Sequence, residues 1–159
     1  MTNRTLETFR DSVSKDKSEL VQSLVDFNGG VGPFQTYADV FTFAATLGAK
    51  YNKRIPLNII SKEPAPISLE IFVSRGYDTV IKLLAIAETN VPNILSFHVL
   101  QAEEKRVQIF EEYANGGLEQ LQEDLKGIVD YSEHLLLLLN LERFPKNDSE
   151  EEFDLTRFL

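Results

Sequence analysis

The stretch that decides the fold covers residues 36–50 and reads TYADVFTFAATLGAK. Its apolar residues recur at helical spacing, but they occupy two adjoining sides of the helix instead of one. One side carries Ala38, Phe41, Ala45 and Gly48, and the other carries Val40, Phe43, Ala44 and Leu47. A helix that is apolar over so much of its surface is typical of the centre of a domain. Its alanines and glycine leave room for a neighbouring helix to pack closely.

The residues before this central helix predict further helix. Apolar residues recur at helical spacing in Leu6–Val13 and again in Lys15–Phe27, which form either one helix or two. Asn28-Gly29-Gly30 predicts the end, because glycine readily adopts the left-handed conformation found there. Backbone amides at Gly29–Gly32 could bind an anion before the next helix. An ordinary turn between helices is the interpretation we favour.

The residues after the central helix change character. Three prolines interrupt Lys53–Ser68 and exclude a continuous helix. We therefore expect an ordered surface linker, in which Ile55–Ile60 is a candidate for a short extended segment. Ile67–Val73 fits two structures, because its apolar residues alternate as in a strand and also suit one face of a helix. Helix is the interpretation we favour.

Glycine and proline divide the following region into shorter helices. Gly76 predicts a break before a helix over Tyr77–Thr89, and a turn around Pro92 ends that helix. Another helix is expected at Ala102–Ala114. Asn115-Gly116-Gly117 then predicts its end, by the same argument as for the earlier glycines.

The last long helix is expected at Leu118–Glu142, where apolar residues alternate spacings of three and four. Such a heptad seam packs inside a bundle or pairs with another chain, and both alternatives stay open. Leu135–Leu139 makes the helix apolar all round, so its own domain or a partner must cover that turn.

A short tail follows this helix. An acidic run after Pro145 leads to Phe153–Leu159, whose large apolar residues either dock on the domain or bind another protein. The candidate protein interface therefore consists of apolar residues from the helix and the tail: Leu135, Leu136, Leu138, Leu139, Phe153, Leu155, Phe158 and Leu159.

Together these elements predict a mainly α fold. The 159 residues fit one domain, and a hydrophobic content of 43% supplies a core without disulfides or metal. We expect a single-domain compact helical bundle of about five or six helices over residues 1–144, which includes the Pro-rich linker. Residues 145–159 form the acidic linker and the apolar tail.

Composition excludes several classes of protein. The chain has no cysteine, which rules out disulfides, thiol catalysis and cysteine-bound zinc, and this fits a cytoplasmic location. No apolar run approaches the roughly 20 residues that span a bilayer, and from the polar start we expect no signal peptide. A net charge of -9 argues against non-specific binding to nucleic acid, because phosphate contacts need a positive field.

The residues that could carry chemistry are few. His134 shares a helix face with Asp130, but no third metal ligand is evident, and His98 is distant in sequence. Neither a Gly-x-Ser-x-Gly elbow nor a phosphate-binding loop occurs. We therefore expect no catalytic residue, no metal and no cofactor.

One basic cluster stands out from the acidic background. Lys50, Tyr51, Lys53 and Arg54 follow one another closely at the end of the central helix. Cations near a helix C-terminus stabilise the helix dipole, which explains part of the cluster. The remaining interpretation is contact with nucleic acid, with the tyrosine stacking on a base.

Two signatures resemble those of a known family. The first combines Gly32–Phe34, Thr36–Ala45, Leu47-Gly48 and Lys53–Leu57, and the second is Glu111–Leu118. Together they resemble DNA phosphorothioation-associated protein 4, also called Dnd system-associated protein 4, over roughly Ser18–Leu139. The family accompanies bacterial systems that replace a non-bridging phosphate oxygen of DNA with sulfur and restrict unmodified DNA.

This resemblance implies a setting and brings no catalytic residues. Sulfur transfer belongs to other components, and the absence of cysteine agrees, because this chain cannot carry a persulfide. We therefore expect a non-enzymatic accessory protein that binds proteins of the modification or restriction machinery, with a homodimer as a further alternative. A DNA-binding regulator or sensor that uses the basic cluster is the second hypothesis, and an enzyme with an unrecognised site is the third.

Overall fold

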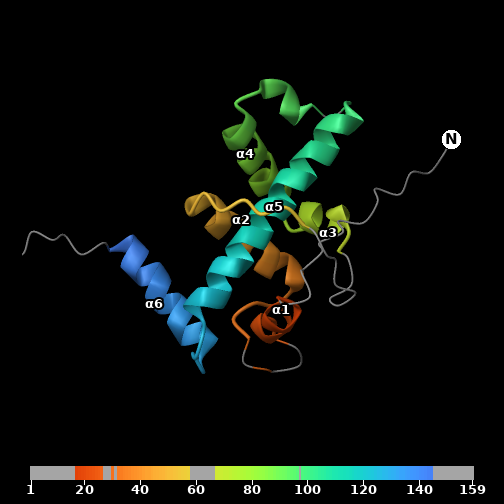
Figure 1. Ribbon diagram of the computed structural model, residues 1–159. Coiled ribbons are helices and arrows are strands. Elements are labelled where there is room, and N and C mark those ends of the chain that lie inside the picture. The colour runs from red at the N-terminus through yellow and green to blue at the C-terminus, as the bar shows by residue number, and fades with distance from the viewer. Residues whose placement is uncertain (1–16, 27–29, 31, 58–66, 97, 145–159) are drawn as a thin grey trace, which may run out of the picture.

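The computed structural model describes residues 17–26, 30, 32–57, 67–96 and 98–144. The helices in these residues are α1 (Ser18–Leu24), α2 (Tyr37–Lys50), α3 (Leu69–Ser74), α4 (Asp78–Thr89), the 3-10 helix η1 (Pro92–Leu95), α5 (Leu100–Asp124) and α6 (Tyr131–Arg143) (Figure 1). This confirms the predicted mainly α bundle. The helix expected at Leu6–Val13 and the tail after residue 144 lie outside the described residues, so the division at residue 144 stays a prediction.

The crossing of α2 and α5 forms the centre of the molecule. Both helices are buried along most of their contact, and Phe41 and Phe110 are fully buried there. Gly48 of α2 lies so close to α5 that an added Cβ would lie 2.1 Å from the Tyr113 carbonyl oxygen. The small residues of 36–50 therefore act as predicted, since they let a neighbouring helix approach closely.

The start of α2 is defined by a capping box. The Thr36 side chain accepts a hydrogen bond from the Asp39 amide, and the Asp39 carboxylate accepts one from the Thr36 amide. Tyr77 and Arg75 also donate to this carboxylate, at 2.6 and 2.8 Å. Although burial opposes the change, the hydrogen bonds from Tyr77 and Thr36 lower the pKa of Asp39. One side chain thus caps α2 and joins it to the turn between α3 and α4.

The region before α2 differs slightly from the prediction. Helix α1 ends at Leu24, earlier than the expected end at Asn28-Gly29-Gly30. The chain leaves the helix early because Val25 pairs with Phe34 in a parallel bridge, in which the Phe34 amide donates to the Leu24 carbonyl at 3.1 Å. Residues 27–29 and 31 lie outside the described residues, so the suggested anion site at Gly29–Gly32 is not tested.

Two predictions for the middle of the chain are confirmed. Leu69–Ser74 is helical, so helix was the better interpretation of residues 67–73. Gly76 has a φ of +78°, a left-handed conformation that glycine adopts without strain, and it separates α3 from α4. The expected extended segment Ile55–Ile60 is described only as far as Leu57, because residues 58–66 lie outside the described residues. The Ile55 amide donates to the Glu112 carbonyl at 3.0 Å, so this part of the linker crosses α5.

Two predictions about the last helices are wrong. Helix α5 continues through Asn115-Gly116-Gly117 without stopping, because these glycines lie against other backbone: a Cβ on Gly116 would lie 1.8 Å from the Lys53 carbonyl oxygen. The single helix expected at Leu118–Glu142 is instead two helices. It breaks between Asp124 and Tyr131, where Gly127 takes a φ of +78°.

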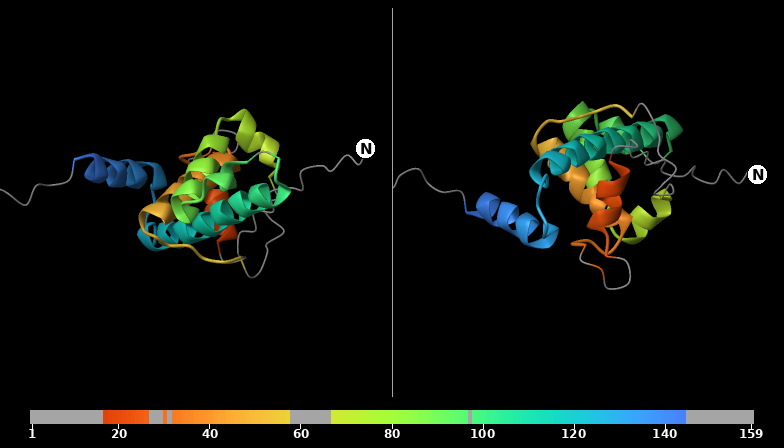
Figure 2. Two further views of the ribbon diagram at one scale, coloured as in Figure 1. Left: turned by 90° about the horizontal axis from the view of Figure 1, so that it is seen from above. Right: turned by 60° about the horizontal axis from the view of Figure 1, so that its bottom comes forward.

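Helix α6 occupies the edge of the molecule. Both views in Figure 2 show it at the outside of the bundle, extending away from the other helices. Within the described parts of the chain, none of the helices combines the length and apolar character that a membrane crossing requires.

Candidate protein-interaction surface

The inward side of α6 holds it to the bundle. The Asp130 side chain accepts a hydrogen bond from the Glu133 amide at 2.9 Å and so begins the helix. Leu135 is buried in the main core, and Leu138 packs half-buried against that core. Of the predicted heptad residues in α6, Leu135 is buried but Leu139 is half-exposed, so the seam packs on the bundle only in part.

The opposite side of α6 exposes four large apolar side chains, Leu136, Leu137, Leu141 and Phe144, which we call the outer stripe. Leu137, Leu141 and Phe144 are spaced i, i+4 and i+7, so they follow one face of the helix. Their exposed fractions are 52%, 50% and 67%. Contiguous apolar surface of this kind marks interaction sites in soluble proteins.

An apolar groove lies on the inward edge of α6, and we call it the inner groove. It has a volume of about 350 Å³ and is formed by α2, the end of α5 and α6. Its apolar lining consists of Phe43, Leu47, Leu121, Leu135, Leu138 and Leu139. Leu139 stays half-exposed, so the groove is open to solvent along α6.

The predicted interface residues are therefore divided between two surfaces. Leu136 belongs to the outer stripe, whereas Leu135, Leu138 and Leu139 line the inner groove. Phe153, Leu155, Phe158 and Leu159 lie outside the described residues. Sequence analysis missed Leu137, Leu141 and Phe144, although a helical wheel begun at the Asp130 cap places them on one face.

The histidine and carboxylate noted in the sequence, His134 and Asp130, lie together at the start of α6. His134 and Asp130 both line a shallow groove of about 460 Å³ beside the outer stripe. The Asp130 carboxylate is already the cap of α6. Across the described residues, no group of three or more histidine and acidic side chains could hold a metal ion.

The predicted basic cluster is brought together, but each of its cations has an acidic partner. Lys50 forms an ion pair with Glu142 of α6, and Lys53 lies 3.6 Å from Glu123. Tyr51 is half-exposed, and the Lys50 ammonium lies 5.3 Å from the centre of its ring. These carboxylates offset the positive field that phosphate would need.

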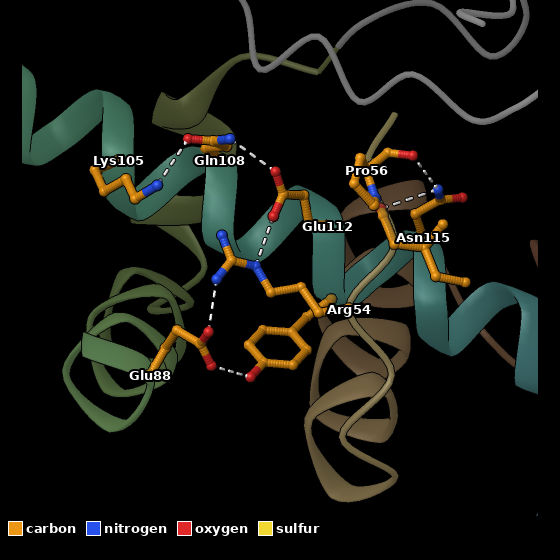
Figure 3. A network of polar contacts seen from close by, with 9 residues as sticks. Arg54, Pro56, Glu88, Lys105, Gln108, Glu112 and Asn115 are labelled. Atoms are coloured by element: carbon orange, nitrogen blue, oxygen red, sulfur yellow. Dashed lines mark hydrogen bonds and ion pairs between the residues drawn. The ribbon is translucent and has the colours of Figure 1, made fainter. Parts of the chain in front are cut away.

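Arg54 is the centre of a polar network that joins three segments (Figure 3). Its Nε donates to Glu112 and its Nη1 donates to Glu88, both at 2.6 Å. The hydroxyl of Tyr113 also donates to Glu88, and Gln108 donates to Glu112 at 2.7 Å. The Tyr113 hydroxyl and Arg54 lower the pKa of Glu88, and burial together with Glu88 raises the pKa of Tyr113 to about 12. The network therefore ties the linker to α4 and α5.

Comparison with known proteins agrees with the two signatures. A family model described as DNA sulphur modification system-associated protein 4 matches residues 10–158, which include the helical bundle and most of the tail. No curated protein and no solved structure matches the chain. Because the match covers nearly the whole sequence, the chain belongs to the family of DNA sulphur modification system-associated protein 4.

Proposed function

We propose that this chain is a non-enzymatic accessory protein of a bacterial DNA phosphorothioation modification or restriction system, and that it acts by binding another protein of that system. The family supplies the setting, since its description names association with a DNA sulphur modification system. The outer stripe of α6 is the observation that carries the proposal, because it is apolar, helical and exposed.

The energetics of the outer stripe favour a protein partner. Burial of a large apolar side chain stabilises a complex by about 1.5–3 kcal/mol relative to leaving it in water. An amphipathic helix with apolar residues at i, i+4 and i+7 suits a hydrophobic groove on another protein. We therefore expect α6 to be the recognition helix of the complex.

The Arg54 network supports a non-enzymatic role, because its two carboxylates are held in ion pairs. Glu88 and Glu112 face the same guanidinium, that of Arg54. A general acid needs a raised pKa, and hydrogen bonds lower the pKa of Glu88. The Arg54 network therefore has a structural explanation, because it connects the linker to α4 and α5.

Co-expression tests this proposal. A tagged full chain should retain a modification or restriction protein encoded beside it through purification at moderate salt. The retained protein should remain after nuclease treatment, because the contact does not depend on DNA. A chain that purifies alone in the presence of all these proteins would contradict the proposal.

The alternative is a DNA-binding regulator or sensor that uses Lys50, Tyr51, Lys53 and Arg54. Exposed Tyr51 beside Lys50 favours it, whereas the ion pairs of all three cations oppose it. It predicts binding that weakens steeply with salt and is lost in a Lys50→Ala and Lys53→Ala variant. Arg54 is left intact in this variant because its removal would disturb the bundle.

A further inference from the structure

The inner groove leaves the attachment of α6 to the bundle incomplete. On the α6 side only Leu135 is fully buried, Leu138 is half-buried, and Leu139 is 50% exposed. Phe43 and Leu47 of α2 are also only half-buried on the other side of the groove. Apolar surface of α2 and α6 thus faces one open space above the buried Leu121 of α5, and an apolar segment in that space would cover this surface.

The size of the inner groove limits what can occupy it. Its volume of about 350 Å³ is near the lower end of the roughly 300–1,000 Å³ found for concave binding sites. A short segment with a few large side chains fits such a space better than a whole helix does.

The sequence supplies such a segment close by. Phe153–Leu159 contains four large apolar residues, and the family match extends through residue 158, so the segment is part of the family pattern. The eight residues Pro145–Glu152 can span up to about 28 Å when extended. The 13 residues of α6 are only about 20 Å long, so the segment can reach any point along the groove.

The charge at the edge of the inner groove is also compatible with binding of this segment. Glu142 at its rim is paired with Lys50, but Asp124 lies there too, and Arg157 is the cation of the segment. A covalent connection raises the effective concentration of the segment at the groove to about the millimolar range. Neither a second copy nor a partner protein has this advantage at low concentration.

We propose that the segment Phe153–Leu159 docks in the inner groove of its own chain and completes the packing of α6 against α2 and α5. The outer stripe remains exposed on the other side of the same helix. The proposal concerns the isolated chain and does not depend on the proposed function.

Cysteine cross-linking tests the proposal, because the natural chain has no cysteine to interfere. One full-length variant carries Leu139→Cys with Phe158→Cys. The matched control carries Leu137→Cys with Phe158→Cys, at nearly the same sequence separation and exposure but on the opposite side of α6. Dilute protein is oxidised, and the rate of disulfide formation within one chain is measured by mass.

The expected result is an intramolecular disulfide that forms on the order of tenfold faster from position 139 than from position 137. Equal rates, or a faster reaction at position 137, would overturn the proposal. A covalent dimer as the main product would also overturn it, because a second copy would then occupy the groove.

Hydrogen exchange provides a second readout without cysteine. Phe153→Ser with Phe158→Ser should raise amide exchange in α6 several-fold, whereas Asp154→Asn with Thr156→Ser should not. Unchanged exchange in the serine variant would count against docking. Since no partner is present in either experiment, a failure here leaves the co-expression test of the proposed function unaffected.

Discussion

Gly117 of α5 lies against the backbone of Ala44 in α2, so closely that a Cβ atom on Gly117 would lie 1.7 Å from the Ala44 carbonyl oxygen. Gly48 makes the reciprocal contact from α2, against the Tyr113 carbonyl. No side chain fits between the helices at these points. Glycine therefore sets the distance between the two central helices.

Gly117→Ala should destabilise the bundle. Alanine favours the helix by about 1 kcal/mol over glycine, but the clash is with backbone, so α2 and α5 must separate. We expect a net loss of about 2 kcal/mol, in the range found for overpacked cores. Urea unfolding followed by circular dichroism measures this change. Glu104→Ala, on the exposed side of α5, is the control and should change stability by less than about 0.5 kcal/mol. A Gly117→Ala variant as stable as the natural chain would refute the close contact.

Arg54→Ala should destabilise the chain through the carboxylates that it leaves behind. Glu112 is buried, and it would lose its guanidinium partner together with Glu88. We expect a cost of about 2 kcal/mol, as for other hydrogen bonds to charged groups. Adding Glu112→Gln should recover part of this loss, because the buried charge is then absent. Lys82→Ala, which breaks the Lys82–Asp78 pair on α4, is the comparison and should cost about 0.5 kcal/mol or less. Equal effects of the two alanine substitutions would argue against the network.

Glu111 should make stability depend on pH. Burial, together with the neighbouring Glu112, raises the pKa of Glu111 from 4.5 to about 8. The unfolded chain releases this proton near pH 4.5 but the folded chain holds it to about pH 8, so the free energy of unfolding should fall as pH rises between these values. Glu111→Gln should flatten this fall and stabilise the chain by at least about 1 kcal/mol near pH 9. Glu104→Gln controls for the loss of one charge. The raised pKa of Glu111 would be contradicted if the free energy of unfolding of both variants, Glu111→Gln and Glu104→Gln, fell with pH as it does in the natural chain from pH 5 to about pH 9.

How far the sequence predicts this fold depends on which contacts are local. The central helix was predicted within one residue, because its apolar pattern and its Thr36 cap lie within the segment itself. Asn115-Gly116-Gly117 was misinterpreted as a helix end because the same glycines serve a tertiary contact with Lys53 and Ala44, distant in sequence. The heptad pattern was locally convincing, yet Gly127 breaks the helix within it.

The candidate surface also could be predicted only as far as its features are local in sequence. The basic cluster could be found because its residues are adjacent in sequence, but its carboxylate partners come from α4, α5 and α6. Likewise, Leu135–Leu139 could be identified as excess apolar surface. A helical wheel groups Leu137, Leu141 and Phe144 on one face, but which face of α6 is exposed depends on how the helix packs, and the sequence does not predict that.

The outer stripe leads to the prediction on which the proposed function depends. Leu137→Ser with Leu141→Ser removes two exposed apolar side chains, so folding should be unaffected. Binding should weaken strongly, since central apolar residues of an interface carry much of its energy. Asn140→Ser, an exposed polar position between them, is the matched control and should bind as the natural chain does.

The most direct measurement is the affinity of the purified full chain, its Leu137→Ser with Leu141→Ser variant and its Asn140→Ser variant for the co-purifying modification or restriction protein. The account predicts at least about a hundredfold loss of affinity in the double variant, from about 3 kcal/mol of lost burial, and no loss in the control. Equal affinity of all three chains, with the double variant folded, would contradict the account.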